Sequence, residues 1–280
     1  MGNIVWLASY PKSGNTWVRA FIHHLFRNAE GPLDINELGG GNISTSEAQM
    51  RWYTSLDPRP PESWTPEDVD RMRPEAHRLI AAAFPGTVFC KTHCALKRSR
   101  GFPTVNLEVT AGAIYIVRNP LDIAVSYANF QGLDLDMAIQ VMNAANFEIP
   151  NGPDNVSQPF GSWSQHVASW TAQANDRLLV LRYEDMIETP RETFRRLVAH
   201  LGLDADAARI DRAIGHVSFA EMRAQEERHG FSERSPAQER FFRAGRAGQW
   251  RDVFDDRQVA AMVKANREQM ERFGYLSEAS

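Results

Sequence analysis

The sequence predicts an α/β fold: a single domain with a central, mainly parallel sheet flanked by helices. Short runs of apolar and β-branched residues recur along the 280 residues, and helix-like sequence separates each run from the next. The runs are almost continuously apolar, which is typical of strands buried on both faces of a parallel sheet. No internal repeat, low-complexity tract or linker divides residues 1–280, so we expect one domain.

The predicted strands are short and lie in the first two thirds of the chain. They cover residues 4–9, 87–90, 113–118 and 178–183. The helix-like segments between and after them are residues 17–26, 65–84, the stretch after Asn119-Pro120, about 163–174 and 190–202. The clearest of these is 65–84, because Thr65 can cap it, Pro66 suits the first helical position and Pro85-Gly86 ends it.

Three long segments do not fit this alternation, and we expect them to form lids or acceptor-binding loops. They are residues 31–61, 147–161 and 228–242. Trp52, Tyr53 and Phe147 could line an apolar acceptor pocket, although aromatic residues in such loops are as often packing residues.

The charge balance excludes some functions. The formal net charge is -4, so no global basic field indicates nucleic acid binding. No signal-like segment and no run of roughly 20 apolar residues is seen, so we expect a cytoplasmic protein with no membrane span. Cys90 and Cys94 flank His93, but a zinc site usually needs three or four ligands and no second cluster exists. We therefore expect free thiols and no metal.

The loop after the first predicted strand, "ASYPKSGNTW" at residues 8–17, has the composition of an anion site. Lys12 supplies a charge, Gly14 lets the backbone approach a ligand, and the following helix adds its dipole. Short polar donors are Ser13, Asn15 and Thr16. The loop suits phosphate or sulfate, with an ordinary capped helix start as the alternative. It does not match G-x-x-x-x-G-K-[ST], because Lys12 precedes the glycine.

"YPKSGNTW" resembles the 5′-phosphosulfate loop of the cytosolic sulfotransferase family. Further segments match that family in order: "KTH" (91–93), "YIVRNPLDIAVSY" (115–127), "YEDM" (183–186), "VSFAEM" (217–222) and "FFRAGRAGQWRDVF" (241–254). The resemblance covers nearly the whole chain. It implies a P-loop-like phosphosulfate-binding loop after the first strand and a donor, 3′-phosphoadenosine 5′-phosphosulfate (PAPS), as co-substrate.

The resemblance also implies which residues hold this donor. The 5′ end would lie on Lys12 to Trp17. Arg118, with its bidentate guanidinium, and Ser126 would bind the 3′-phosphate. The phosphate would be closed over by Arg243, Ala244 and Gly245. Around the adenine the resemblance places Trp17, Tyr183, Ser218 and Phe219.

The chemistry implied is sulfuryl transfer from PAPS to a hydroxyl, or less often an amine, of a small-molecule acceptor. His93 would be the general base, because imidazole titrates near neutral pH. Lys12 would stabilise the leaving 5′-phosphate, and Ser126 would restrain that lysine until the acceptor arrives. Lys91 lies two residues from His93, so both would face the transferring group from one extended segment.

The sequence departs from the family pattern at a few positions. Asn15 replaces a Thr, and Ala244 replaces a Lys, which puts one phosphate contact in doubt. The family's dimer motif is not legible in "WRDVFDDRQV", so a monomer and a homodimer are both open. The acceptor could be a phenol, steroid, lipid, sugar or natural product.

Two other functions are weighed against this one. An ATP-dependent, kinase-like phosphoryl transferase would need an Asp after a buried strand to help hold magnesium, where this chain has Arg118. A non-catalytic nucleotide-binding protein would tolerate the loss of His93 and Lys12, and both are present.

Overall fold

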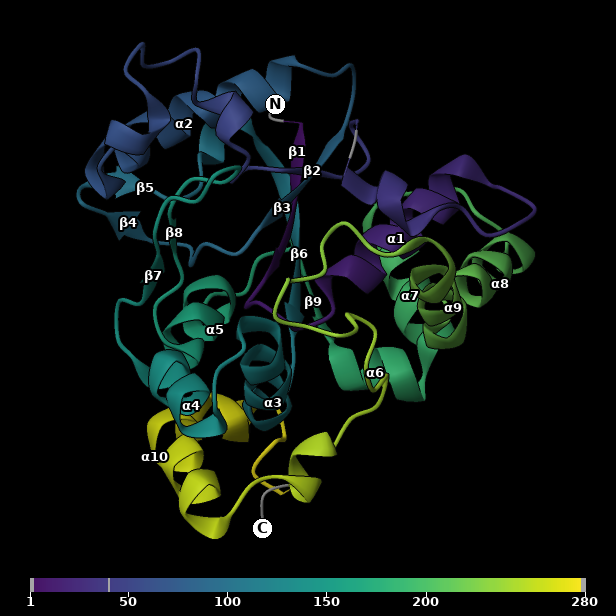
Figure 1. Cartoon of the computed structure of the whole chain (residues 1–280). Coiled ribbons are helices and arrows are strands. Elements are labelled where there is room, and N and C mark those ends of the chain that lie inside the picture. Colours follow the sequence, from purple (N-terminus) through teal and green to yellow (C-terminus); the bar gives the residue numbers. More distant parts are fainter. Residues whose placement is uncertain (1–2, 40, 278–280) are drawn as a thin grey trace.

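A parallel sheet lies at the centre of the molecule (Figure 1). The computed structural model describes residues 3–39 and 41–277. Across the sheet the strands are Thr45–Ser46 (β2), Val88–Thr92 (β3), Ile4–Ser9 (β1), Thr110–Val117 (β6) and Leu178–Arg182 (β9). Every neighbouring pair is parallel. The predicted α/β fold with a central parallel sheet is confirmed, and the two-residue edge strand β2 adds to the four strands expected.

Helices fill the connections between the strands. Their bounds are Asn15–Arg27 (α1), Pro66–Ala82 (α2), Pro120–Gln131 (α3), Leu135–Asn143 (α4), Trp163–Thr171 (α5), Tyr183–Glu188 (α6), Pro190–His200 (α7), Ala207–His216 (α8), Phe219–His229 (α9) and Asp256–Arg272 (α10). Two antiparallel hairpins join Arg98–Ser99 (β4) to Phe102–Pro103 (β5) and Glu148–Ile149 (β7) to Gln158–Pro159 (β8).

Strand β1 is buried along its whole length, which explains its continuous apolar sequence. Trp6 and Leu7 are neighbours in the chain and point to opposite faces, so they enter two different hydrophobic cores. The Leu7 core includes side chains of α1 and α7, and the Trp6 core includes side chains of α3, α5 and α10. Figure 1 shows these two groups of helices on opposite sides of the sheet.

Local sequence signals fix several element ends. Thr65 and Asp68 form the capping box that starts α2, with Pro66 in the first turn, as expected. Strand β3 runs two residues beyond the predicted end and so includes Lys91. The predicted last strand ends earlier, because Tyr183 is the first residue of α6.

The three segments expected to be lids have some structure of their own. Residues 31–61 contain β2 and short 3₁₀ turns, and part of this segment packs on α2. Residues 147–161 form the β7–β8 hairpin, and residues 228–242 follow α9. In the described part of the chain, no helix is long and apolar enough to cross a membrane.

Candidate active site

One cavity of about 610 Å³ lies at the carboxyl ends of the strands. Each long strand is followed at once by cavity residues: the loop at Pro11 to Trp17 after β1, His93 after β3, Arg118 after β6 and Tyr183 after β9. The strands are parallel, so these segments, far apart in the sequence, meet at one edge of the sheet. The cavity is therefore the place where the predicted site residues can act together.

The loop between β1 and α1 presents backbone N–H groups at the start of a helix. Gly14 occupies the N-cap position with φ 100°, and no side chain caps the helix. A Cβ on Gly14 would lie 2.7 Å from Cδ2 of Tyr183, so only glycine fits this turn. The alternative of an ordinary side-chain-capped helix start is thus wrong. The free first-turn N–H groups are available to an anion.

Arg118, which follows β6, joins this loop to the end of the strand beside β1 in the sheet. Its side chain is buried, it donates to the carbonyl oxygen of Lys12 at 2.9 Å, and its guanidinium lies 4.1 Å from the ring centroid of Tyr183. Several buried atoms of the loop and of Arg118 lack a hydrogen-bond partner among the described residues, and those that can donate to an anion include Ser13 Oγ, Trp17 Nε1 and Arg118 Nε. Buried polar groups are normally satisfied, so these atoms fit a site that binds a polar, anionic ligand.

Lys12 carries its amine into the same cavity. Its Nζ lies 4.3 Å from the ring centroid of Phe130 and 4.1 Å from that of Phe241. Burial, together with the charges of Lys91 and Arg118, lowers the pKa of Lys12 to about 7. A bound anion would raise this pKa again, because an opposite charge favours the ammonium form.

His93 is oriented by the backbone of the phosphate-binding loop. Its Nδ1 lies 2.8 Å from the carbonyl oxygen of Ser9. A carbonyl can only accept, so Nδ1 carries the proton and Nε2 carries the lone pair. Burial and the charge of Lys91 lower the pKa of His93 to about 3, which keeps the ring neutral near pH 7.

Lys91 faces a carboxylate that the sequence reasoning missed. Glu233 Oε2 lies 3.8 Å from Lys91 Nζ, and Glu233 Oε1 lies 2.7 Å from the guanidinium of Arg19. Burial would raise the pKa of Glu233, but Lys91 and Arg19 lower it to about 2. Glu233 belongs to a segment predicted only as a lid, and no spacing in the sequence links it to Arg19 or Lys91.

Most of the predicted donor-site residues line the cavity. They are Lys12, Gly14, Asn15, Thr16, Trp17, Arg118, Ser126, Tyr183, Phe219, Arg243, Ala244 and Gly245. Gly245 packs on Phe219, since a Cβ there would lie 2.3 Å from the ring. Arg243 donates to the side-chain oxygen of Gln249 at the cavity mouth.

Three predicted residues are used differently from the expectation. Ser13 is a fully buried residue of the loop and does not line the cavity. Ser218 also lies outside it, and its hydroxyl accepts from the Glu221 N–H and caps α9. The Asn15 amide donates to the Leu7 carbonyl at 2.9 Å, so only its backbone can serve an anion. Ser126 lines the cavity with Lys12, whose amine lies against two aromatic rings, and the restraint of Lys12 by Ser126 stays a prediction.

None of the three aromatic residues that could have lined an acceptor pocket lines the cavity, so the structure favours the alternative that they are packing residues. Tyr53 is fully buried and donates to Glu47, and the Trp52 indole donates to the Ser46 carbonyl. Phe147 packs on Phe160, which does line the cavity. The walls away from the loop after β1 come instead from three segments: Ser44, Thr45, Ser46, Ala48 and Gln49; Ser126, Tyr127, Phe130 and Gln131; and the β7–β8 hairpin.

The two cysteines are buried free thiols. Cys94 Sγ donates to Glu47 Oε1 at 3.2 Å, and His93 is bound to Ser9. Within residues 3–39 and 41–277, no group of three His, Cys, Asp or Glu side chains could hold a metal ion. Cys90, Cys94 and His93 therefore do not form a metal cluster.

Residues 3–274 match the family described as "Sulfotransferase domain". This chain belongs to the sulfotransferase family. The match confirms the family and the enzyme class that the six motifs predict.

Curated relatives of this sulfotransferase include sulfotransferase 1E1 of Mus musculus, 27% identical over 219 residues, which are 78% of this chain and 65% of the relative. Sulfotransferase 1C2 of Homo sapiens is 25% identical over 276 residues, covering 95% of this chain and 82% of the relative. Two solved structures share the fold with a TM-score of 0.61: mouse sulfotransferase SULT7A1 complexed with PAP, and retinol dehydratase in complex with androsterone and inactive cofactor PAP. The mouse enzyme is 20% identical in sequence, and the alignment covers 96% of this chain and 84% of that structure. Retinol dehydratase is 19% identical, and the alignment covers 96% of this chain and 80% of that structure.

Proposed function

We propose that this sulfotransferase moves a sulfuryl group from PAPS to a hydroxyl group of a small-molecule acceptor. One observation carries the proposal: the glycine turn at the start of α1 and the buried Arg118 face one cavity and are joined through the Lys12 carbonyl. The two anionic ends of a bisphosphorylated nucleotide would each meet a positive group there.

The residues present fit that donor. The helix N-terminus at Gly14 to Trp17 would hold the 5′ end, and Arg118, Ser126 and Arg243 would hold the 3′-phosphate. The donor also accounts for the orphaned Arg118 Nε, because a phosphate oxygen can accept from it. Arg118 stands where a magnesium-dependent phosphoryl transferase would need a carboxylate, which disfavours the kinase-like alternative.

His93 would remove the proton of the acceptor hydroxyl. Its Nδ1–H donates to the Ser9 carbonyl, so Nε2 is unprotonated and its lone pair can accept the proton. The anionic donor would raise the low pKa of His93 and so increase its basicity when the acceptor is in place. Proton transfer by a positioned group typically contributes about 10²- to 10⁴-fold in rate.

Lys12 and Lys91 would stabilise the negative charge that develops on the leaving phosphate. Both line the cavity with His93, and Lys91 lies on the same strand end as this histidine. Lys12 would exchange its aromatic contacts for the phosphate oxygen, which restores its full charge.

The acceptor would be uncharged and partly apolar. The cavity wall beyond His93 mixes amide and hydroxyl groups with apolar side chains: Ser46, Gln49, Asn155, Gln158, Ile149, Val156 and Phe160. Among the described residues that line the cavity, the one acidic side chain is Glu233, which is neutralised by Arg19 and Lys91. The wall therefore offers no free charge to an ionic acceptor.

The experiment that tests this function uses sulfur-labelled PAPS with p-nitrophenol, a primary alcohol, an amine and a fractionated metabolite extract, all in EDTA. We expect label on a hydroxyl compound and release of PAP. A parallel reaction with γ-labelled ATP and magnesium serves as the control. Phosphate transfer from ATP, or failure to bind PAP in calorimetry, would contradict the proposal.

A further inference from the structure

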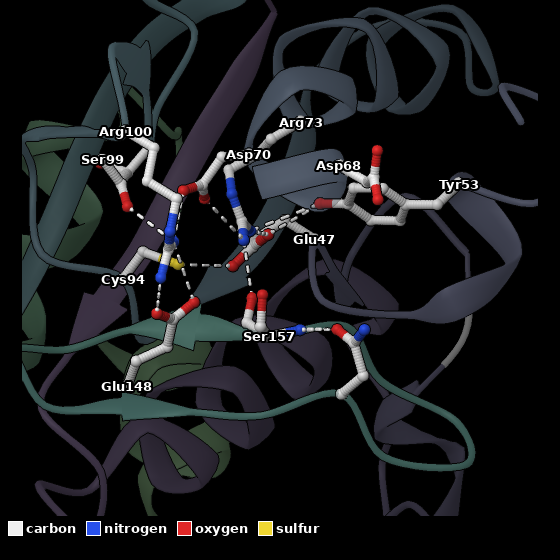
Figure 2. A network of polar contacts seen from close by, with 12 residues as sticks. Glu47, Tyr53, Asp68, Asp70, Arg73, Cys94, Ser99, Arg100, Glu148 and Ser157 are labelled. Atoms are coloured by element: carbon white, nitrogen blue, oxygen red, sulfur yellow. Dashed lines mark hydrogen bonds and ion pairs between the residues drawn. The ribbon is translucent and has the colours of Figure 1, made fainter. Parts of the chain in front are cut away.

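A fully buried ion pair lies behind the active site, outside the cavity (Figure 2). Glu47 Oε2 lies 2.6 Å from the Arg73 guanidinium, and both side chains are completely buried. The Tyr53 hydroxyl donates to the same oxygen at 3.3 Å. Glu47 follows β2, and Arg73 lies in the middle of α2. The pair therefore ties the edge of the sheet to the helix that covers it.

The other oxygen of Glu47 holds the segment that carries His93. Thr92 Oγ1 and Cys94 Sγ each donate to Glu47 Oε1 at 3.2 Å. Thr92 Oγ1 also accepts from the Cys94 N–H at 3.1 Å, and the Glu47 N–H donates to the Lys91 carbonyl at 3.2 Å. Thr92 and Cys94, the residues immediately before and after His93, are thus both bonded to the Glu47 carboxylate.

The same pair also reaches the part of the cavity wall that the β7–β8 hairpin forms. Arg73 donates to the Ser157 carbonyl at 2.6 Å, between Val156 and Gln158, which line the cavity. Figure 2 shows Arg73 between Glu47 and Ser157. Asp70 extends this connection, since Arg100 bonds both Asp70 and Glu148 at the start of β7. One buried network therefore sets the spacing between the proposed base and the acceptor hairpin.

Stability alone does not explain this arrangement. Two charges lose their hydration in the core, and apolar residues of similar volume often replace such a pair without loss of stability. What an apolar pair could not supply is the acceptor oxygen for Thr92 and Cys94. Burial would raise the pKa of Glu47, but Arg73 and the hydrogen bonds lower it to about 2, so the carboxylate stays ionised and accepts both donors.

We propose that Glu47 is a positioning residue of the sulfotransferase reaction, acting through Thr92 and Cys94 on His93 and through Arg73 on the acceptor hairpin. This inference rests on the proposed role of His93 as general base. A displaced imidazole would lose its alignment with the acceptor oxygen, and a shift of about 1 Å can lower a rate about 100-fold.

The experiment compares Thr92→Val, which removes the hydroxyl but keeps the shape, with Thr92→Ser, which keeps the hydroxyl. Glu47→Gln is made as well, although it leaves Arg73 without a counter-charge and can fail to fold. Val69→Ala is the matched control, because Val69 is buried in the cluster with Tyr53 but has no polar side-chain atom that could bond the Glu47 carboxylate. The readouts are the single-turnover rate with PAPS and phenol, which stays protonated near pH 7 and so needs a base, the Kd of PAP, the melting temperature and the imidazole ¹⁵N shifts of His93.

We expect Thr92→Val to lower the single-turnover rate about 10- to 100-fold at unchanged PAP affinity and to reduce the Nδ1–H tautomer of His93. Thr92→Ser and Val69→Ala should keep the wild-type rate and tautomer. Wild-type rate and tautomer in Thr92→Val, with His93→Ala inactive, would overturn the positioning role and leave the proposed function intact. A normal rate in His93→Ala would instead remove the base role on which both rest.

Discussion

Arg118 donates a hydrogen bond to the carbonyl oxygen of Lys12, and this 2.9 Å contact joins the residue after β6 to the loop after β1. Lys12 has φ 68°, a left-handed conformation that is uncommon for a residue with a side chain. Arg118 holds the carbonyl of that residue in place while its remaining N–H groups stay available. The arginine therefore shapes the phosphate-binding loop as well as offering its charge to a ligand.

Replacing Arg118 should weaken the binding of 3′-phosphorylated nucleotides most. A hydrogen bond to a charged group contributes about 1.5–3 kcal/mol, so Arg118→Ala should weaken PAP binding about 10- to 100-fold. AMP lacks the 3′-phosphate, so Arg118→Ala should weaken its binding less. The weakening that remains would come from the loop, because the Lys12 carbonyl loses its hydrogen bond. Calorimetry with both nucleotides checks this, and equal losses would show that the 3′-phosphate site lies elsewhere.

Replacing His93 should strongly lower the rate of turnover without changing the affinity for PAP. We expect His93→Ala to lower kcat about 10²- to 10⁴-fold, because the acceptor proton then has no positioned base. The Kd of PAP should change little. His229→Ala, an exposed histidine at the end of α9, is the control and should keep the wild-type kcat. Near-normal turnover in His93→Ala would remove it from the base role.

The affinity for PAP should fall as the pH rises above 7. Lys12 has a pKa of about 7, so it is protonated below that pH and becomes neutral above it. A bound phosphate favours the charged form, so binding takes up a proton, and the association constant should fall up to about tenfold per pH unit between pH 7.5 and 9. Calorimetry in buffers of different ionisation enthalpy measures both effects. Lys12→Met should flatten the dependence; a persistent slope would point to Lys91, whose pKa burial also lowers.

Gly14 should not tolerate even a methyl group. Gly14→Ala combines a left-handed backbone with a Cβ only 2.7 Å from Tyr183, so the loop must move. We expect at least about tenfold weaker PAP binding and a lower melting temperature. Gly86→Ala is the matched control, because Gly86 also has positive φ (74°) but open space around its Cβ. It should lose about 1–2 kcal/mol of stability and keep its PAP affinity. Equal PAP affinity in the two variants would contradict the close fit at Gly14.

Several features of the site could be predicted because they depend on local sequence. The run "IVWLAS" is apolar up to its last residue and becomes the buried central strand β1, and "PKSGNT" shortly after it becomes the turn that opens α1. Arg118 follows a second buried strand, and parallel strands bring such positions to the same edge. The family motifs then indicated what these positions bind.

Other parts of the site depend on contacts that no local pattern encodes. Glu47 and Glu233 lie in segments whose composition predicted only loops, yet their carboxylates bind Thr92 and Lys91. Tyr53, expected at an acceptor pocket, is buried against Glu47 instead. The packing of segments that are distant in the sequence determines the partner of each buried charge.

The α/β fold, the loop that opens α1 and the family could thus be predicted from the order of residues, because buried strands and tight anion-binding turns need particular residues at fixed local spacings. The tautomer of His93, the low pKa of Lys12 and the walls of the cavity follow instead from the packing of the folded chain. Each of these depends on burial and on partners far away in the chain, such as the Ser9 carbonyl at 2.8 Å from His93.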